Sequence, residues 1–184
     1  MHFARALETG NVLWQLTDGR FSDLTIALGT LAPKTVFDAV CDQDLHANLA
    51  WLPLREDYCL PASTALACPL PTPNRILAIG RNYAEHIKEL GNKVPDQPVI
   101  FMKPATSIVA SGGSVVIPPY SSDCHHEIEL AVLIGKAAKG VSAEVALAHV
   151  TGYGVSLDLT LRDVQNVQKE KGLPWEIAKA FDTS

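Results

Sequence analysis

An apolar run interrupted by two carboxylates, from Cys124 to Gly135, constrains this chain more than any other stretch. Its alternation predicts a β-strand, because successive side chains of a strand point to opposite faces. One face carries the apolar residues Ile128, Leu130, Val132 and Ile134. The other carries Glu127 and Glu129, and burying two like charges about 7 Å apart is costly unless a cation neutralises them. The run therefore indicates a metal site or, alternatively, an edge strand with one face in water.

A second alternating run, from Gly152 to Leu161, repeats this anomaly. Asp158 is a lone carboxylate in the middle of that predicted strand, between two leucines. Together with the two glutamates it makes an all-oxygen ligand set, which hard cations such as Mg²⁺ prefer while keeping positions open for water or a chelating substrate. His125 and His126 could add nitrogen ligands, but we expect them to pack or to hydrogen-bond around the site.

A short helix is predicted over residues 82–90, where Asn82 suits the N-cap and Gly91 suits the C-terminal stop. His86 and Glu89 are i, i+3 neighbours on this helix, close enough to interact. A carboxylate that orients an imidazole raises its basicity, so this pair could activate water. The alternative is a pair that simply faces solvent.

Three further polar side chains suit an anionic substrate. Lys179 stands in an apolar context, where its ammonium could stabilise a developing enolate or carboxylate oxygen. Arg162 and Gln165, one helical turn apart, could grip a substrate carboxylate, and the arginine fork is suited to bidentate binding.

A domain boundary is predicted near residue 70, because four prolines between Pro61 and Pro73 exclude a helix or a central strand there. We expect a small N-terminal α/β module over residues 1–70 and a metal-binding catalytic domain over residues 71–184. In the first we expect a hairpin over residues 12–28 and short helical pieces over 33–40 and 45–54. In the second we expect strands over residues 75–80 and 99–102 and helices over 137–149 and 162–169.

Composition narrows the classes of partner. The net charge is −5 and no block of basic residues occurs, which argues against nucleic acid or an anionic membrane as the main partner. The four cysteines have no C-x-x-C spacing, so we expect reduced thiols rather than a zinc site. No apolar stretch approaches the roughly 20 residues of a membrane span. These features predict a cytoplasmic protein.

Six motifs follow one another from residue 75 onward: Gly80–Glu89, Phe101–Pro104, His125–Leu130, Leu157–Gln165, Lys171–Trp175 and Ala178–Lys179. Together they resemble the fumarylacetoacetate hydrolase family, most nearly its shorter acylpyruvate hydrolase and oxaloacetate decarboxylase-like members. The resemblance implies an α+β, β-rich fold with a mixed β-sheet roll or barrel, usually assembled as a homodimer. It also implies a small 2-oxo or diketo acid as the substrate.

The resemblance also implies a role for each candidate residue. The metal, Mg²⁺ or Mn²⁺, is bound by Glu127, Glu129 and Asp158. Catalysis is assigned to His86 and Glu89, which activate water, and to Lys179 at the substrate oxygens. Substrate contacts are assigned to Arg162, Gln165 and Lys103.

The leading hypothesis is a metal-dependent hydrolase that cleaves a carbon–carbon bond in an acylpyruvate or a related diketo acid, a reaction of aromatic catabolism. The Gly-Thr-Pro-containing segment of such proteins is absent from the sequence, so we expect the C-terminal part of the family domain to be missing. Two alternatives stay open. One is an isomerase or decarboxylase of 2-oxo acids that uses the same metal-bound enolate. The other is a non-catalytic module that binds a metal or an oxo acid.

Overall fold

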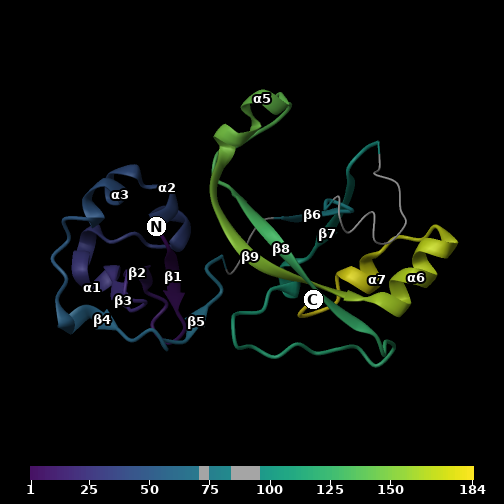
Figure 1. Cartoon of the computed structure of the whole chain (residues 1–184), viewed down its shortest axis with the longest axis horizontal. Helices are drawn as coiled ribbons and strands as arrows, with labels where there is room; N and C mark the ends of the chain where they lie inside the picture. The colour runs from purple at the N-terminus through teal and green to yellow at the C-terminus, as the bar shows by residue number, and fades with distance from the viewer. Residues whose placement is uncertain (71–74, 84–95) are drawn as a thin grey trace. The chain divides into compact units, whose positions relative to one another are not determined.

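The computed structural model describes residues 1–70, 75–83 and 96–184, and these form two compact units of mixed helix and sheet (Figure 1). The first unit comprises Met1–Pro71, Ala110–Gly113 and Glu129–Ser156. The second comprises Thr72–Val109, Ser114–Ile128 and Leu157–Ser184. This mixture of elements confirms the predicted α+β class, and the sheets within the described residues are open, with no closed barrel. The predicted division into domains at residues 70 and 71 stays a prediction.

The first unit contains a five-stranded antiparallel sheet with the order β4-β3-β2-β1-β5. Its strands are β1 Phe3–Ala6, β2 Val12–Gln15, β3 Phe21–Asp23, β4 Cys59–Leu60 and β5 Leu66–Ala67. The predicted hairpin is formed by β2 and β3, in which Trp14 pairs with Ser22. Gly19 turns the chain between them with a φ of 86°, which a residue without a side chain adopts readily.

The hairpin is shorter than predicted, because the segment after Asp23 is the helix α1, Leu24–Leu28, and not a strand. The carboxylate of Asp23 caps this helix, and its Oδ1 accepts hydrogen bonds from the amides of Thr25 at 2.9 Å and Ile26 at 3.1 Å. An N-cap of this kind satisfies amides that a helix start leaves unpaired. The cap therefore overrides the strand preference of the apolar residues that follow.

The two short helices predicted next in the sequence are confirmed as α2, Val36–Cys41, and α3, Gln43–Leu49, although α3 ends earlier than expected. They cover one face of the sheet, where the buried core consists of Val12, Leu24, Val36, Ala39 and Leu49. Because neighbouring residues of a strand face opposite sides, Leu13 lies on the other face with Ala6 and Phe21. Short 3-10 helices, η1 Gly29–Leu31 and η2 Glu56–Tyr58, complete the segment.

The second unit contains the predicted strands β6, Ile76–Gly80, and β7, Val99–Lys103, and these form an antiparallel pair. The 3-10 helix η3, Ala105–Ser107, follows β7. Helices α6, Arg162–Lys171, and α7, Glu176–Lys179, pack together (Figure 1). Gly172 ends α6 in the left-handed conformation with a φ of 64°, and its amide donates to the carbonyls of Gln168 and Lys169. The buried core here is Leu159, Leu161, Ala178 and Phe181.

The strands that carry the predicted carboxylates are β8, Cys124–Ile134, and β9, Val150–Leu161, which pair with one another and pass through both units. The amide of Arg162 donates to the carbonyl of Asp123 at 2.7 Å, and at the other end the amide of Gly135 donates to His149 at 3.0 Å, so the strands are antiparallel. Glu127 on β8 and Asp158 on β9 are close across this pair, since Lys179 Nζ donates to both carboxylates.

The connection between β8 and β9 is less helical than predicted. Only α5, Ala143–Ala146, and the 3-10 helix η4, Leu147–His149, are helical, so the helix predicted over residues 137–149 is wrong in its first half. Residues 137–142 include Gly140, whose φ of 63° lies outside the helical region.

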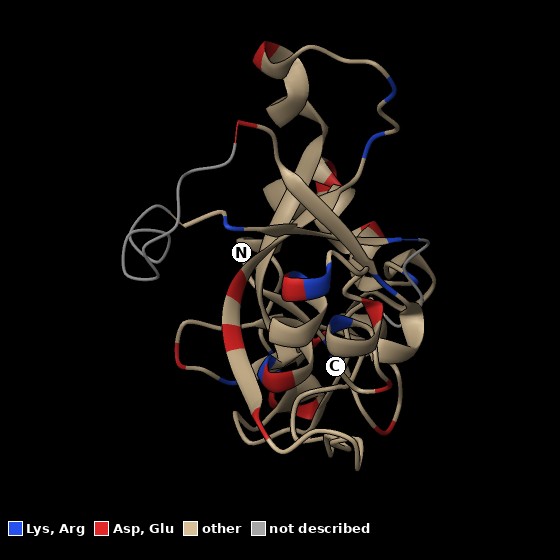
Figure 2. Cartoon of the chain, turned by 90° about the vertical axis from the view of Figure 1, so that its right-hand side faces the viewer, with Lys and Arg blue, Asp and Glu red and all other residues tan. Residues whose placement is uncertain are grey.

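The apolar face of β8 is exposed, whereas the sequence pattern favoured burial. Ile128 is 68% exposed and Leu130 is 60% exposed, because no element within the described residues covers this face. Acidic and basic residues are interspersed along the ribbon in the part of the chain that the structure describes (Figure 2). No helix within those residues combines the length and hydrophobicity that a membrane crossing needs.

Substitution at Leu13 tests the core of the first sheet. Leu13 is fully buried, so we expect Leu13→Ala to lower the free energy of unfolding by about 2–5 kcal/mol through lost packing and a cavity. The control is Leu31→Ala, at a side chain that is 85% exposed, for which the change should stay within about 0.5 kcal/mol. Urea denaturation followed by tryptophan fluorescence measures both. Equal effects of the two substitutions would contradict the assigned core.

Candidate metal centre

Glu127, Glu129 and Asp158 come together on the paired strands β8 and β9. One carboxylate oxygen of each lies within 4.8 Å of the others. Oxygen ligands lie about 2.1 Å from Mg²⁺ and at 2.3–2.6 Å from larger hard cations, so small side-chain adjustments would bring all three onto one ion. Neither His125 nor His126 belongs to this group of described residues.

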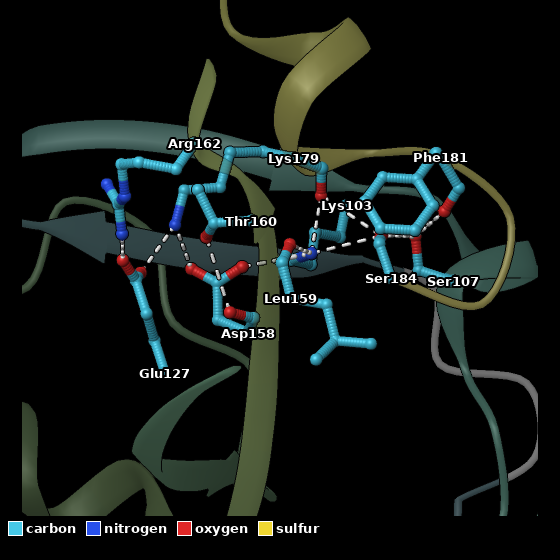
Figure 3. Close-up of polar contacts among 10 residues, drawn as sticks. All are labelled: Lys103, Ser107, Glu127, Asp158, Leu159, Thr160, Arg162, Lys179, Phe181 and Ser184. Atoms are coloured by element: carbon cyan, nitrogen blue, oxygen red, sulfur yellow. Dashed lines mark hydrogen bonds and ion pairs between the residues drawn. The ribbon is translucent and has the colours of Figure 1, made fainter. Parts of the chain in front are cut away.

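The ammonium of Lys179 lies between two of these carboxylates (Figure 3). Its Nζ donates to Glu127 Oε2 at 2.6 Å and to Asp158 Oδ2 at 2.7 Å. The same nitrogen is 5.2 Å from the centroid of the Phe101 ring, and the side chain is only 4% exposed. The apolar residues around Lys179 in the sequence therefore belong to a buried environment in which its ammonium meets two carboxylates.

Arg162 contributes a second cation and a link to Gln165. Its guanidinium donates to Glu127 Oε1, and its Nη1 donates to Gln165 Oε1 at 2.5 Å. On its other side Nε donates to His125 Nδ1 at 3.4 Å, and His125 Nε2 lies 3.0 Å from Asp123 Oδ1. Arg162 is the first residue of α6. These contacts orient its side chain toward Glu127 on β8.

The protonation state of Glu127 follows from these contacts. Burial alone would raise its pKa, but the hydrogen bonds and positive charges of Lys179 and Arg162 outweigh that effect and lower the pKa. The carboxylate is thus ionised at neutral pH, in the form that binds a cation.

Lys103 lies beside Asp158, on the side away from Glu127, and its ammonium contacts several oxygens (Figure 3). Its Nζ is 3.0 Å from Asp158 Oδ1, 3.0 Å from Ser184 Oγ and 3.4 Å from the Leu159 carbonyl, and it also donates to the carbonyl of Lys179. Burial lowers its pKa, and the charge of Asp158 partly offsets that effect. The side chain is 7% exposed.

Asp158 Oδ1 supports a bound cation at this place. Although it forms an ion pair with Lys103, this buried oxygen accepts no well-aligned hydrogen bond from any described residue. A buried acceptor with an unused lone pair is uncommon in a folded protein. The all-oxygen donor set and this oxygen fit a hard divalent cation such as Mg²⁺ or Mn²⁺.

Two basic residues near the site were not singled out by the sequence pattern. Burial lowers the pKa of Lys169, and the positive charges of Arg162 and Arg81 lower it further, so these groups share one electropositive region. Arg81 also has a φ of 56°, a left-handed conformation that non-glycine residues seldom adopt. For Arg81 the sequence offered one signal, a basic residue directly after the strand predicted over residues 75–80.

Other predicted residues have no structural test. His86 and Glu89 lie outside the described residues, so their catalytic role stays a prediction. The substrate contacts predicted for Arg162, Gln165 and Lys103 are also predictions, since the contacts described above are all within the protein.

Comparison with known proteins identifies the family. Residues 75–184 match the family model described as "Fumarylacetoacetate (FAA) hydrolase C-terminal", which covers more than half of the chain. The chain belongs to the fumarylacetoacetate hydrolase family. The family resemblance seen in the six motifs is thereby confirmed.

Within the matched region, family relatives are nearly half identical to this chain. The mitochondrial oxaloacetate decarboxylase of Dictyostelium discoideum is 47% identical over 113 residues, 61% of this chain and 52% of the relative. The mitochondrial oxaloacetate tautomerase FAHD1 of Bos taurus is 47% identical over 109 residues, 59% of this chain and 49% of the relative. The chain therefore spans about half the length of these relatives.

Solved structures share the fold of this chain. A fumarylpyruvate hydrolase from Pseudomonas aeruginosa, in complex with Mn²⁺ and pyruvate, is 40% identical, with a TM-score of 0.54 over 67% of this chain and 53% of that protein. A fumarylacetoacetate hydrolase from Exiguobacterium antarcticum shares the fold, with 24% identity and a TM-score of 0.65 over 98% of this chain and 62% of that protein.

Asp163 gives the part of the site around α6 a testable pH dependence. It accepts hydrogen bonds from Ser121 Oγ at 2.7 Å and the Ser122 amide at 3.0 Å, and these bonds, led by Ser121, lower its pKa below the ordinary 3.8. Its stabilising effect is complete above pH 3.8 and is lost as the pH falls through the lowered value. We therefore expect Asp163→Ala to melt a few degrees below the wild type at neutral pH, with the gap closing in acid.

Thermal melts by circular dichroism between neutral and strongly acidic pH measure this gap. Asp163→Asn is the matched control, since it keeps an acceptor but has no charge to lose. A gap for Asp163→Ala that does not change with pH would contradict the assigned interaction.

Proposed function

We propose that this chain is the metal-binding part of an enzyme that cleaves a carbon–carbon bond in an acylpyruvate or a related diketo acid by hydrolysis. The observation that carries the proposal is the convergence of Glu127, Glu129 and Asp158 within 4.8 Å. The Mn²⁺ and pyruvate in the P. aeruginosa fumarylpyruvate hydrolase support a divalent metal and a 2-oxo acid as ligands. Either Mg²⁺ or Mn²⁺ suits the oxygen donors.

The residues of the site suit the separate tasks of such a hydrolysis. The metal, when bound to the three carboxylates, supplies Lewis acidity and a template for the substrate oxygens. Arg162 and Gln165, which contact one another at 2.5 Å, orient the substrate carboxylate. The ammonium of Lys179 faces the carboxylate oxygens and stabilises negative charge on the enolate that leaves.

The dyad of His86 and Glu89 takes a proton from water as the water attacks the distal carbonyl. The carbon–carbon bond then breaks, the attacked carbon becomes a carboxylic acid, and the enolate that leaves takes up a proton to give pyruvate. Electrons and atoms balance without a further reactant.

A second candidate function is favoured by the two relatives at 47% identity, which are named as an oxaloacetate decarboxylase and an oxaloacetate tautomerase. Both reactions of a 2-oxo acid pass through an enolate, but neither needs attack by water. In decarboxylation a carbon–carbon bond breaks and carbon dioxide is released. In tautomerisation a proton moves between a carbon and an oxygen of the substrate. Arg162, Gln165 and Lys179 keep the same roles in all three reactions.

A homodimer is proposed on the strength of the family alone, as is a small-molecule substrate in place of nucleic acid or membrane. The cytoplasmic location that the sequence predicts is also a proposal, and two relatives are named as mitochondrial. The third candidate is a non-catalytic module that binds a metal or an oxo acid.

Removal of one ligand tests the metal centre. We expect saturable binding of Mn²⁺ by calorimetry, weakened in Glu127→Gln by at least about ten-fold, since even residues outside the ligand shell contribute that much. The amide is close in shape to the carboxylate, so its neighbours keep their packing. Glu144→Gln is the control, because Glu144 is exposed on α5 and is not a member of the three-carboxylate cluster. Equal binding by both variants would exclude Glu127 as a ligand.

Substitution of His86 separates the candidate reactions. With an acylpyruvate as substrate we expect His86→Ala to lower kcat by about 10²–10⁴-fold, the usual contribution of a general base, while Mn²⁺ affinity is kept. His2→Ala, at an exposed residue of the first unit, is the control. Product analysis by NMR with acylpyruvate and oxaloacetate reports the reaction. Turnover of oxaloacetate alone would favour the decarboxylase or tautomerase, and metal binding without any turnover would favour the binding module.

A further inference from the structure

Glu127 and Asp158, two of the carboxylates of the candidate metal centre, already have counter-charges within the protein. Lys179 contacts Glu127 and Asp158, Arg162 contacts Glu127, and Lys103 lies 3.0 Å from Asp158 Oδ1. The carboxylates Glu127, Glu129 and Asp158 carry three negative charges, and these three cations carry three positive charges, so the named groups sum to zero. A metal site that must bind a divalent cation unaided has no need of such neutralisation.

A divalent cation therefore leaves two uncompensated positive charges in this group. Coulomb repulsion between a divalent ion and an ammonium about 6 Å away weakens metal binding by more than about ten-fold even at an effective dielectric constant of about 20. Arg81 and Lys169 add to the electropositive surroundings, since the charge of Arg81 lowers the pKa of Lys169. A dianion that binds together with the metal removes the excess.

Lys103 is a buried cation that cannot leave to relieve this repulsion. Its nitrogen is enclosed by Asp158, Ser184 and two backbone carbonyls, and only 7% of its side chain is exposed. The hydroxyl of Ser184 is itself held at 2.9 Å by Ser107 Oγ, so the pocket around the ammonium is fixed by four oxygens of the protein and not by solvent.

We infer that metal binding at this centre is coupled to binding of a dianionic ligand, and that the buried charge of Lys103 sets the strength of this coupling without contacting that ligand. The inference rests on the proposed function in one respect, the metal site at Glu127, Glu129 and Asp158. The dianion is a 2-oxo acid with a second ionised group, either a carboxylate or an enolate. The family resemblance predicted that Lys103 contacts the substrate. Lys103 instead acts on metal affinity through its positive charge and its ion pair with Asp158.

Calorimetric titration of Mn²⁺ tests the coupling, in buffer alone, with oxalate as the dianion and with acetate as the monoanion. Free Mn²⁺ is held equal by allowing for the complex that oxalate forms in solution. Oxalate should tighten Mn²⁺ binding to the wild type by at least about ten-fold, a typical coupling between sites, and acetate should do so far less.

Lys103→Gln removes the charge but leaves an amide that donates hydrogen bonds. In this variant we expect Mn²⁺ to bind about ten-fold or more tightly without an anion, and oxalate to add less than in the wild type. Ser184→Ala is the matched control, because it removes one hydrogen bond from Lys103 and keeps the charge, so its coupling should equal that of the wild type. Lys103→Met removes the same charge with a side chain of similar length and replaces Lys103→Gln if the latter does not fold.

The outcomes separate the two proposals. Absence of Mn²⁺ binding to folded wild-type protein, with or without oxalate, would overturn the proposed metal site and this inference together. Mn²⁺ binding that is unchanged or weaker in the neutral variants at Lys103, with the same gain from oxalate as in the wild type, would overturn the coupling by Lys103 and leave the metal site standing.

Discussion

The concentration of like charge on one face of two paired strands is the constraint on which the second unit of this protein depends. One carboxylate oxygen of Glu127 and one of Asp158 lie within 4.8 Å of each other, and partly buried carboxylates this close are stable only with cations beside them. Lys179 supplies a cation that contacts both carboxylates, at 2.6 and 2.7 Å, and it can do so only because α7 packs close to β7 and α6. The packing of the helices therefore determines whether the strand carboxylates can stay ionised.

Sequence pattern was sufficient to find the acidic half of the site. Alternation along two strands places Glu127, Glu129 and Asp158 on carboxylate faces, and no long-range information is needed for that step. The basic half required more. The apolar surroundings of Lys179 and the spacing of Arg162 and Gln165 were only suggestive, and the motif resemblance tied them to the strands.

The rest of the site depends on contacts between residues far apart in the chain. Lys103 meets Asp158, 55 positions later, and Ser184, 81 positions later, and no local spacing predicts such encounters. In the first unit the error ran the other way, since a purely local contact, the Asp23 cap, changed a predicted strand into α1. Burial was misjudged on the apolar face of β8, because alternation shows which residues share a face but not what covers it.

The turn at Gly172 gives the second unit an unusual sensitivity to chain length. Arg162 begins α6 and Lys179 ends α7, yet both side chains grip the same carboxylate of Glu127. The separation between the two cations is set by the Gly172 cap and by the amide of Leu173, which donates to Gln168 at 2.8 Å. Most surface loops accept an inserted residue with little effect. Here one extra residue after Gly172 would shift Lys179 by one position relative to Arg162. The two cations could then no longer contact Glu127 together.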